Sequence, residues 1–102
     1  MSEPIDLRHQ IIDLRDRVRA DDQLTLQIRA LCADTLGLAV EHVPLWARLV
    51  ADLEADSLDF SALADRLAMQ YGIVADETVL REAETVRDLV ALVLSAAPPA
   101  PR

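Results

Sequence analysis

Residues 52–59 read Asp-Leu-Glu-Ala-Asp-Ser-Leu-Asp, and they place Ser57 where a long loop is expected to pass into a helix. At a helix N-terminus, unpaired backbone amides and the positive end of the helix dipole favour an anion. A phosphate ester on the exposed hydroxyl of Ser57 would therefore be stabilised where it forms. Asp56, the preceding residue, could help to hold the Mg²⁺ that phosphoryl-transfer chemistry normally uses.

The surroundings of this serine are acidic and hold no catalytic base. No basic residue lies between Arg48 and Arg66, so a basic enzyme surface would be attracted there. A serine that catalyses acyl transfer needs a nearby base, but His9 and His42 come with no glycine-rich turn and no partners for a metal. Ser57 is therefore interpreted as a substrate of another enzyme. The five acids of this stretch are Asp52, Glu54, Asp56, Asp59 and Asp65.

A helix is predicted directly after the serine. It should run from about Ser57 to Tyr71, with Leu63 and Leu67 on its buried side and Gly72 as its stop.

Two further helices are predicted toward the C-terminus. Residues 76–83 should form a short connecting helix that carries Val79 and Leu80. The last helix should begin at Thr85, whose hydroxyl caps the backbone in a capping-box arrangement with Asp88. Its core face is expected to consist of Val86, Leu89, Val90 and Val93.

Upstream of the serine, apolar residues recur with a helical period from Leu24 to Leu38, and Asp21 and Asp22 are available as caps. Gly37 should end this helix, and Pro44 then keeps the chain out of helical geometry. Residues 38 to about 55 are expected to form a long ordered loop. Its apolar members, which should pack back onto the bundle, are Val40, Val43, Leu45, Trp46, Leu49 and Leu53.

Residues 1–22 carry a separate amphipathic pattern. Leu7, Ile11, Leu14 and Val18 follow a 4,3,4 spacing, which predicts an additional helix. A helix that packs on the bundle is favoured over a dimer seam, because the pattern covers too few heptads for a coiled coil. A monomer is therefore expected.

Composition restricts the possible functions. The formal charge of −8, with every base an arginine, disfavours nucleic acid and anionic membranes as partners. Two glycines are too few for a P-loop or Rossmann site. Cys32 is the only cysteine, expected as a buried thiol beside Ile28 and Leu31. An acidic N-terminal stretch and the lack of an apolar span predict a soluble, cytoplasmic protein.

The sequence around Ser57 resembles the signature of acyl and peptidyl carrier proteins, commonly D-L-G-x-D-S-L-D, whose serine receives 4′-phosphopantetheine from coenzyme A. Further landmarks of that family follow in order between residues 28 and 94. They are Leu36-Gly37-Leu38 followed by Glu41-His42-Val43, then Tyr71-Gly72-Ile73, and then Thr85-Val86-Arg87-Asp88-Leu89.

The resemblance implies an all-α, four-helix bundle of three main helices and one short one, with a long first loop and an extra N-terminal helix. Residues 23–96 would be the carrier domain, 1–22 an extension and 97–102 a disordered tail. Such a protein catalyses nothing itself. It would hold an acyl, aminoacyl or polyketide group as a thioester, and its partners would be a phosphopantetheinyl transferase, an acyl-loading ligase or acyltransferase, and ketosynthase-type enzymes.

Three departures from the family pattern stand out. Glu54 replaces the usual glycine, so the loop must avoid positive φ or accept strain there. Ala75 stands near a usual proline. The exposed face of the second helix lacks several usual glutamates, which predicts an apolar docking patch and a carrier of a specialised lipid or secondary-metabolite pathway. The expected partner-binding residues are Leu58, Asp59, Phe60, Ala62, Asp65 and Met69, with Phe60 alternatively part of the core.

Two other classes of protein remain as alternatives. One is an unmodified helical interaction module in which Ser57 is only a helix cap. The other is an enzyme, against which the missing base argues.

Overall fold

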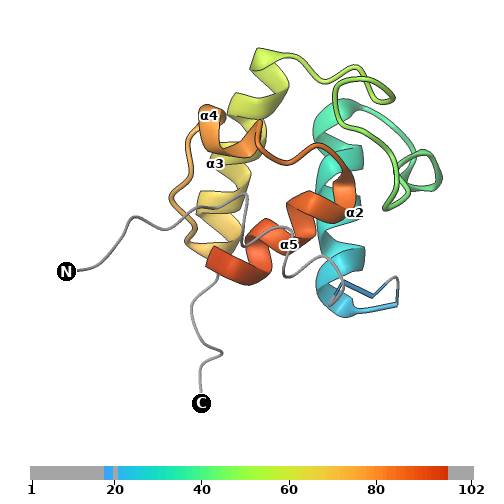
Figure 1. The fold of residues 1–102 in the computed structure, drawn as a ribbon, viewed down its shortest axis with the longest axis horizontal. Coiled ribbons are helices and arrows are strands. Elements are labelled where there is room, and N and C mark those ends of the chain that lie inside the picture. Colours follow the sequence, from blue (N-terminus) through green and yellow to red (C-terminus); the bar gives the residue numbers. More distant parts are fainter. Residues whose placement is uncertain (1–17, 20, 97–102) are drawn as a thin grey trace.

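The computed structural model describes residues 18–19 and 21–96, and Figure 1 shows their helical arrangement. This part of the chain contains helices and one isolated β-bridge, between Arg48 and Thr85, but no strand. The all-α prediction is thus confirmed, while the expectations for residues 1–17 and 97–102 lie outside the described residues. The elements are α2 (Gln23–Leu36), the short 3₁₀ helix η1 (Val40–His42), α3 (Ser57–Tyr71), α4 (Glu77–Leu80) and α5 (Val86–Ala96).

The first described helix, α2, ends where a glycine permits a left-handed backbone. Gly37 has φ of +72°, and the backbone N–H of Leu38 donates to the carbonyl of Ala33 at 2.8 Å. The prediction that Gly37 ends this helix is therefore confirmed. Asp22 occupies the N-cap position, but its side chain makes no capping hydrogen bond, so the predicted aspartate cap of this helix is wrong.

The loop between α2 and α3 is held by hydrogen bonds at both of its sides. On the α2 side, Arg29 donates from Nε to the carbonyl of Val43 at 2.8 Å and from Nη2 to the carbonyl of Val40 at 2.9 Å. On the α5 side, the backbone N–H of Val86 donates to the carbonyl of Ala47 at 3.0 Å. Since the loop is anchored to two helices, the expectation that it is ordered is confirmed.

Not every apolar residue of this loop packs inward. Val43 and Leu49 are buried, and Leu45 and Leu53 pack partly against the core, as predicted. Val40 is exposed, and Trp46 has 73% of its surface in contact with solvent. The prediction was wrong for these two because the loop has no helical or strand period that would say which side faces the bundle.

The main helices share one apolar core, to which α4 adds Leu80. In α4, Asp76 caps the helix by accepting the backbone N–H of Val79 at 3.0 Å. Two polar contacts link the outer edges of α2 and α3: Tyr71 donates to Gln27 Oε1 at 2.8 Å, and Arg66 pairs with Asp34. The core residues of the long helices include Ile28, Leu31, Cys32, Phe60, Leu63, Leu67, Val86, Leu89, Val90 and Val93.

The last helix begins with the predicted capping box. Thr85 Oγ1 accepts the backbone N–H of Asp88 at 3.1 Å, while Asp88 Oδ2 accepts the backbone N–H of Thr85 at 3.2 Å. Among the described residues, no helix is both long enough and apolar enough to cross a membrane.

One buried hydroxyl in α2 gives a stability prediction. Thr25 is buried, and its Oγ1 has no hydrogen-bond partner among the residues that the structure describes. Replacing an unpaired buried hydroxyl with a methyl group removes a desolvation cost, so Thr25→Val should raise the free energy of unfolding by about 1 kcal/mol in urea denaturation.

Thr35→Val is the matched control in the same helix. Thr35 Oγ1 donates to the carbonyl of Leu31 at 2.7 Å, so this substitution removes a hydrogen bond and should lower the free energy of unfolding by about 0.5–1 kcal/mol. Equal effects of the two substitutions would contradict the assignment.

Candidate functional site

Ser57 is the first residue of α3, and its side chain is exposed. The preceding residue, Asp56, has an extended backbone and is the N-cap. The structure therefore has the predicted geometry, with a hydroxyl at the point where the loop becomes a helix. The first backbone N–H groups of α3 and its dipole favour negative charge at this end.

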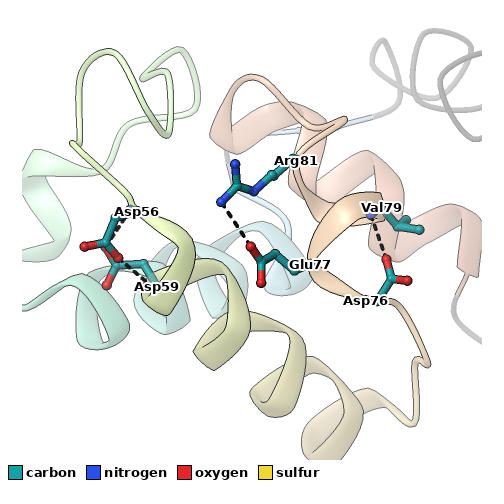
Figure 2. Close-up of polar contacts among 6 residues, drawn as sticks. All are labelled: Asp56, Asp59, Asp76, Glu77, Val79 and Arg81. Atoms are coloured by element: carbon teal, nitrogen blue, oxygen red, sulfur yellow. Dashed lines mark hydrogen bonds and ion pairs between the residues drawn. The ribbon is translucent and has the colours of Figure 1, made fainter.

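The cap of α3 is made by two aspartates and not by the serine. Asp56 Oδ1 accepts the backbone N–H of Asp59 at 3.0 Å, and Asp59 Oδ2 accepts the backbone N–H of Asp56 at 3.0 Å (Figure 2). This reciprocal pair is a capping box, and it leaves the hydroxyl of Ser57 without a capping role. Ser57 is therefore not the cap of this helix.

Sequence reasoning missed this capping box, although its signal was present. An acceptor side chain followed three residues later by a second one, just before an apolar run, is the usual spacing. Asp56 and Asp59 have that spacing. They had been assigned to magnesium and partner binding, respectively, and each carboxylate has at least one oxygen committed to the backbone.

A compact turn leads into Asp56. The backbone N–H of Ala55 donates to the carbonyl of Leu49 at 2.9 Å, and that of Glu54 donates to the carbonyl of Val50 at 3.1 Å. Glu54 has φ of +60°, a left-handed conformation that costs a residue with a side chain about 1–2 kcal/mol. The sequence left two outcomes open where Glu54 replaces a glycine, namely a loop that avoids positive φ and a strained backbone. The structure has the strained backbone.

Asp52 stabilises the start of this turn as a carboxylate. Its Oδ2 accepts the backbone N–H of Arg48 at 2.8 Å and lies 3.4 Å from Arg48 Nε. The backbone hydrogen bond from Arg48 lowers the pKa of Asp52, desolvation opposes it, and the Arg48 side chain lowers the pKa further. The group is therefore charged at neutral pH.

The acidic cluster is a surface feature and not a metal site in itself. Four of its five acids are exposed, and Asp59 is half-buried. Among residues 18–19 and 21–96, no group of three or more His, Cys, Asp or Glu residues is arranged to hold a metal ion. The negative charge can therefore act on an approaching molecule from several sides of the helix start.

The outward face of α3 includes part of the predicted docking patch. Leu58, Ala62, Asp65 and Met69 follow a 4,3,4 spacing and share one side of the helix. Leu58 is 79% exposed and Met69 is 85% exposed, while Ala62 is half-buried. We call these four residues the outer stripe of α3.

Phe60 does not belong to this surface, because its side chain is only 1% exposed. It lies three and seven residues before Leu63 and Leu67, so it falls on the core side of α3. The guanidinium carbon of Arg81 lies 5.3 Å from the centre of its ring, and Arg81 pairs with Glu77 at 3.0 Å (Figure 2). The prediction that Phe60 binds partners is corrected to the stated alternative, a core residue.

Cys32 is an unreactive residue of the core and takes no part in the site. Its side chain is fully buried, and desolvation raises the pKa of the thiol to about 12. A thiol with so high a pKa is a poor nucleophile. The prediction of an inert, buried cysteine is confirmed.

Comparisons with known proteins agree with the geometry of this site. The model of one protein family, described as a phosphopantetheine attachment site, matches residues 26–93. The acyl carrier protein of Treponema pallidum (strain Nichols) is 37% identical over 67 residues, which cover 66% of this chain and 86% of that protein. The acyl carrier protein of Thermotoga maritima is 28% identical over 72 residues, covering 71% and 89%, and that of Petrotoga mobilis is 30% identical over 71 residues, covering 70% and 84%.

The chain belongs to the phosphopantetheine-binding family of carrier proteins. It is a carrier and not an enzyme, and its cofactor is a covalently attached 4′-phosphopantetheine. The site fits such a group because the start of α3 offers an exposed hydroxyl. The N-terminus of a helix also favours the phosphate that would join this hydroxyl to the pantetheine arm.

The different roles of Asp56, which caps α3, and Ser57, which does not, give a prediction. Asp56→Ala removes the cap and should lower the free energy of unfolding by about 1 kcal/mol. Ser57→Ala removes an exposed hydroxyl with no capping role, so the change should stay within about 0.5 kcal/mol. Urea denaturation of both variants checks this, and a larger loss for Ser57→Ala than for Asp56→Ala would contradict it.

Proposed function

We propose that Ser57 Oγ is the attachment point of the 4′-phosphopantetheine arm. Among the described residues, the exposed aliphatic hydroxyls are those of Ser57, Ser61 and Thr78. Ser61 lies a turn inside α3, and Thr78 lies within the short helix α4. Ser57 alone combines exposure with the first position of a long helix, and this observation carries the proposal.

Attachment requires little of this chain beyond the presentation of the hydroxyl. Ser57 Oγ gives up its proton to a base of the transferase and forms a bond to the phosphorus of coenzyme A that bears pantetheine. The bond from that phosphorus to the bridging oxygen breaks, and the adenosine half leaves. The phosphate that remains on Ser57 carries one negative charge, which the start of α3 stabilises. Once attached, the arm supplies a terminal thiol that carries the cargo as a thioester.

Asp56 would act in this step by position. One of its oxygens, Oδ1, accepts the backbone N–H of Asp59, which fixes the carboxylate next to the serine. A divalent cation that arrives with the transferase or with coenzyme A could bind the other oxygen. Asp56 offers a single free oxygen, so the other ligands of the cation would come from the transferase or from coenzyme A.

Partner enzymes would bind the outer stripe of α3. Leu58 and Met69 supply exposed apolar area at the two ends of the stripe, and Asp65 supplies charge between them. Apolar contact gives affinity, while charge steers the encounter with a basic surface. The partners proposed are a phosphopantetheinyl transferase, a loading ligase or acyltransferase, and a ketosynthase-type enzyme.

The same stripe supports the proposal of a specialised pathway. Its apolar ends would fit a partner whose own docking surface is partly apolar, whereas a partner that relies on many basic residues would find only Asp65 on the stripe. The pathway is therefore proposed to be one of specialised lipids or secondary metabolites. A cytoplasmic site of action is supported by the single cysteine, which can form no internal disulfide.

Intact-mass measurement tests the attachment site. After incubation with coenzyme A, Mg²⁺ and a promiscuous phosphopantetheinyl transferase, the chain should gain the mass of one phosphopantetheine. Ser57→Ala should abolish the gain, and Ser61→Ala, on the same helix, should leave it intact. Modification of the Ser57→Ala variant would overturn the assignment.

Kinetics with a loading enzyme of its own pathway test the docking stripe. Leu58→Ala with Met69→Ala should lower kcat/KM for loading roughly thirtyfold, since two exposed anchors that each contribute of the order of 1 kcal/mol to binding together contribute about 2 kcal/mol. The control is Val74→Ala, which truncates an exposed apolar residue outside α3 and should change kcat/KM less than about twofold. Equal effects of the stripe and control substitutions on kcat/KM would show that the loading enzyme does not bind the outer stripe of α3.

A second kinetic comparison tests the pathway. A ketosynthase of general fatty-acid synthesis should accept this carrier much less efficiently than its own carrier. Equal efficiency would contradict the proposal of a specialised pathway while leaving attachment at Ser57 untouched.

A further inference from the structure

A surface groove lies between the loop after α2 and the end of α4. Its volume is about 610 Å³, which is within the range of sites for small molecules. Arg48, Val50 and Ala51 line it on the loop side, and Arg81 and Ala83 line it on the other side. We call it the arginine groove.

Backbone contacts hold the two sides of the arginine groove together. The backbone N–H of Leu49 donates to the carbonyl of Glu84 at 2.9 Å, and Arg48 forms the isolated β-bridge with Thr85. The groove is therefore formed before a ligand enters it, and binding there requires little reordering of the chain.

The loop side of the groove lies directly beside the turn that leads into Ser57. The carbonyl of Leu49 accepts the backbone N–H of Ala55 at 2.9 Å, and the carbonyl of Val50 accepts that of Glu54 at 3.1 Å. Ala55 is separated from Ser57 by a single residue. A group attached to Ser57 Oγ therefore begins next to this groove.

The other side of the groove brings a base to the start of α3. The guanidinium carbon of Arg81 lies 5.3 Å from the centre of the ring of Phe60, which belongs to the first turn of α3. In Figure 2, the side chain of Arg81 extends from the end of α4 toward this end of α3. The sequence has no base between Arg48 and Arg66, so the fold supplies one that the local sequence lacks.

Both arginines of the groove can exchange their present partners. Arg81 pairs with Glu77 at 3.0 Å, Arg48 Nε lies 3.4 Å from Asp52 Oδ2, and all four side chains are partly exposed. Exposed ion pairs contribute little to stability, so a new acceptor can compete for either guanidinium. Each guanidinium has five N–H donors to offer.

The lining of the groove suits a chain of amides better than a hydrocarbon chain. Val50, Ala51 and Ala83 offer apolar surface, while Glu82 and Glu84 add carboxylates to the two guanidiniums. Guanidiniums donate to carbonyl and phosphate oxygens, and carboxylates accept amide N–H groups. A phosphopantetheine arm carries all three of these groups.

Two other surface grooves of the described residues fit the arm less well. One lies between α2 and α3, and Arg66, its lining residue of α3 nearest to Ser57, is about 14 Å further along the helix. The other lies between α3 and the segment before α4. Its charged lining residues are Asp65, Asp76 and Glu77, which repel a phosphate.

We propose that the 4′-phosphopantetheine arm on Ser57 lies in the arginine groove, where Arg48 and Arg81 donate hydrogen bonds to its oxygen atoms. The proposal rests on the attachment at Ser57 proposed above. The apolar part of the arm packs on Val50 and Ala51, which removes exposed apolar surface from water.

This position of the arm separates partner docking from delivery. The arginine groove and the outer stripe of α3 share no residue, so a partner enzyme can bind the stripe while the arm still occupies the groove. Delivery then requires the active site of the partner to bind the arm more strongly than the groove does.

Backbone NMR spectra of the chain before and after attachment of the arm test the proposal. The amide signals of Val50, Ala51 and Ala83 should shift on attachment more than those of Gln70 and Val74, which line the other two grooves. Shifts confined to the residues next to Ser57, or larger at Gln70 or Val74, would overturn the proposal.

A charge substitution identifies the role of Arg81. In the chain with the arm attached, Arg81→Gln should reduce the shifts at Ala51 and Ala83 roughly twofold, because loss of a charge-assisted hydrogen bond lowers the docking equilibrium constant about tenfold. Arg66→Gln is the matched control, since Arg66 is also a half-exposed arginine that pairs with one aspartate or glutamate. Equal effects of the two substitutions would contradict the role of Arg81.

The motion of the arm gives a measurement that needs no substitution. With ¹⁵N-labelled coenzyme A as donor, the order parameters of the arm amides should exceed about 0.6, and values below this mark an arm that moves freely and would refute the proposal. Intact mass reports attachment at Ser57 in every sample, so a failure of this proposal is distinguishable from a failure of the attachment site.

Discussion

The reciprocal hydrogen bonds between Asp56 and Asp59 fix the residue at which α3 begins, and the remaining features of the site depend on that residue. Because two aspartates satisfy the helix start, Ser57 is left with an exposed hydroxyl and no capping role. Moving the helix start by one residue would rotate every later side chain by about 100°. Leu63 and Leu67 would leave the core, and the outer stripe would turn toward it.

The loop before α3 keeps this helix start in place relative to the bundle. Arg29 holds it on the α2 side, and the backbone of α5 holds its middle. Asp52 and the left-handed Glu54 then complete the turn into Asp56. The strain at Glu54 is tolerated because hydrogen bonds on both sides of it define the backbone. The position of Ser57 is thus determined by contacts from three separate parts of the chain.

The features that sequence could predict are those with a local cause. Gly37 and Gly72 end their helices because each takes positive φ, and Thr85 and Asp88 cap α5 because their spacing allows it. What could not be predicted depended on tertiary packing. Phe60 and Met69 are both apolar residues of α3, yet their places differ because only the core side of the helix meets α2 and Arg81. Sequence left Phe60 open between the two locations.

Tertiary packing also decided the position of Trp46 in the loop. The sequence predicted that Trp46 packs onto the bundle, but the structure exposes it to solvent. This position has an optical consequence. Trp46 is the only tryptophan, and its indole is already surrounded by water in the native chain, so its emission should change little when the bundle melts. A protein that covers the loop would instead shift that emission to shorter wavelength. Intrinsic fluorescence of this carrier therefore reports on encounters with other molecules rather than on folding.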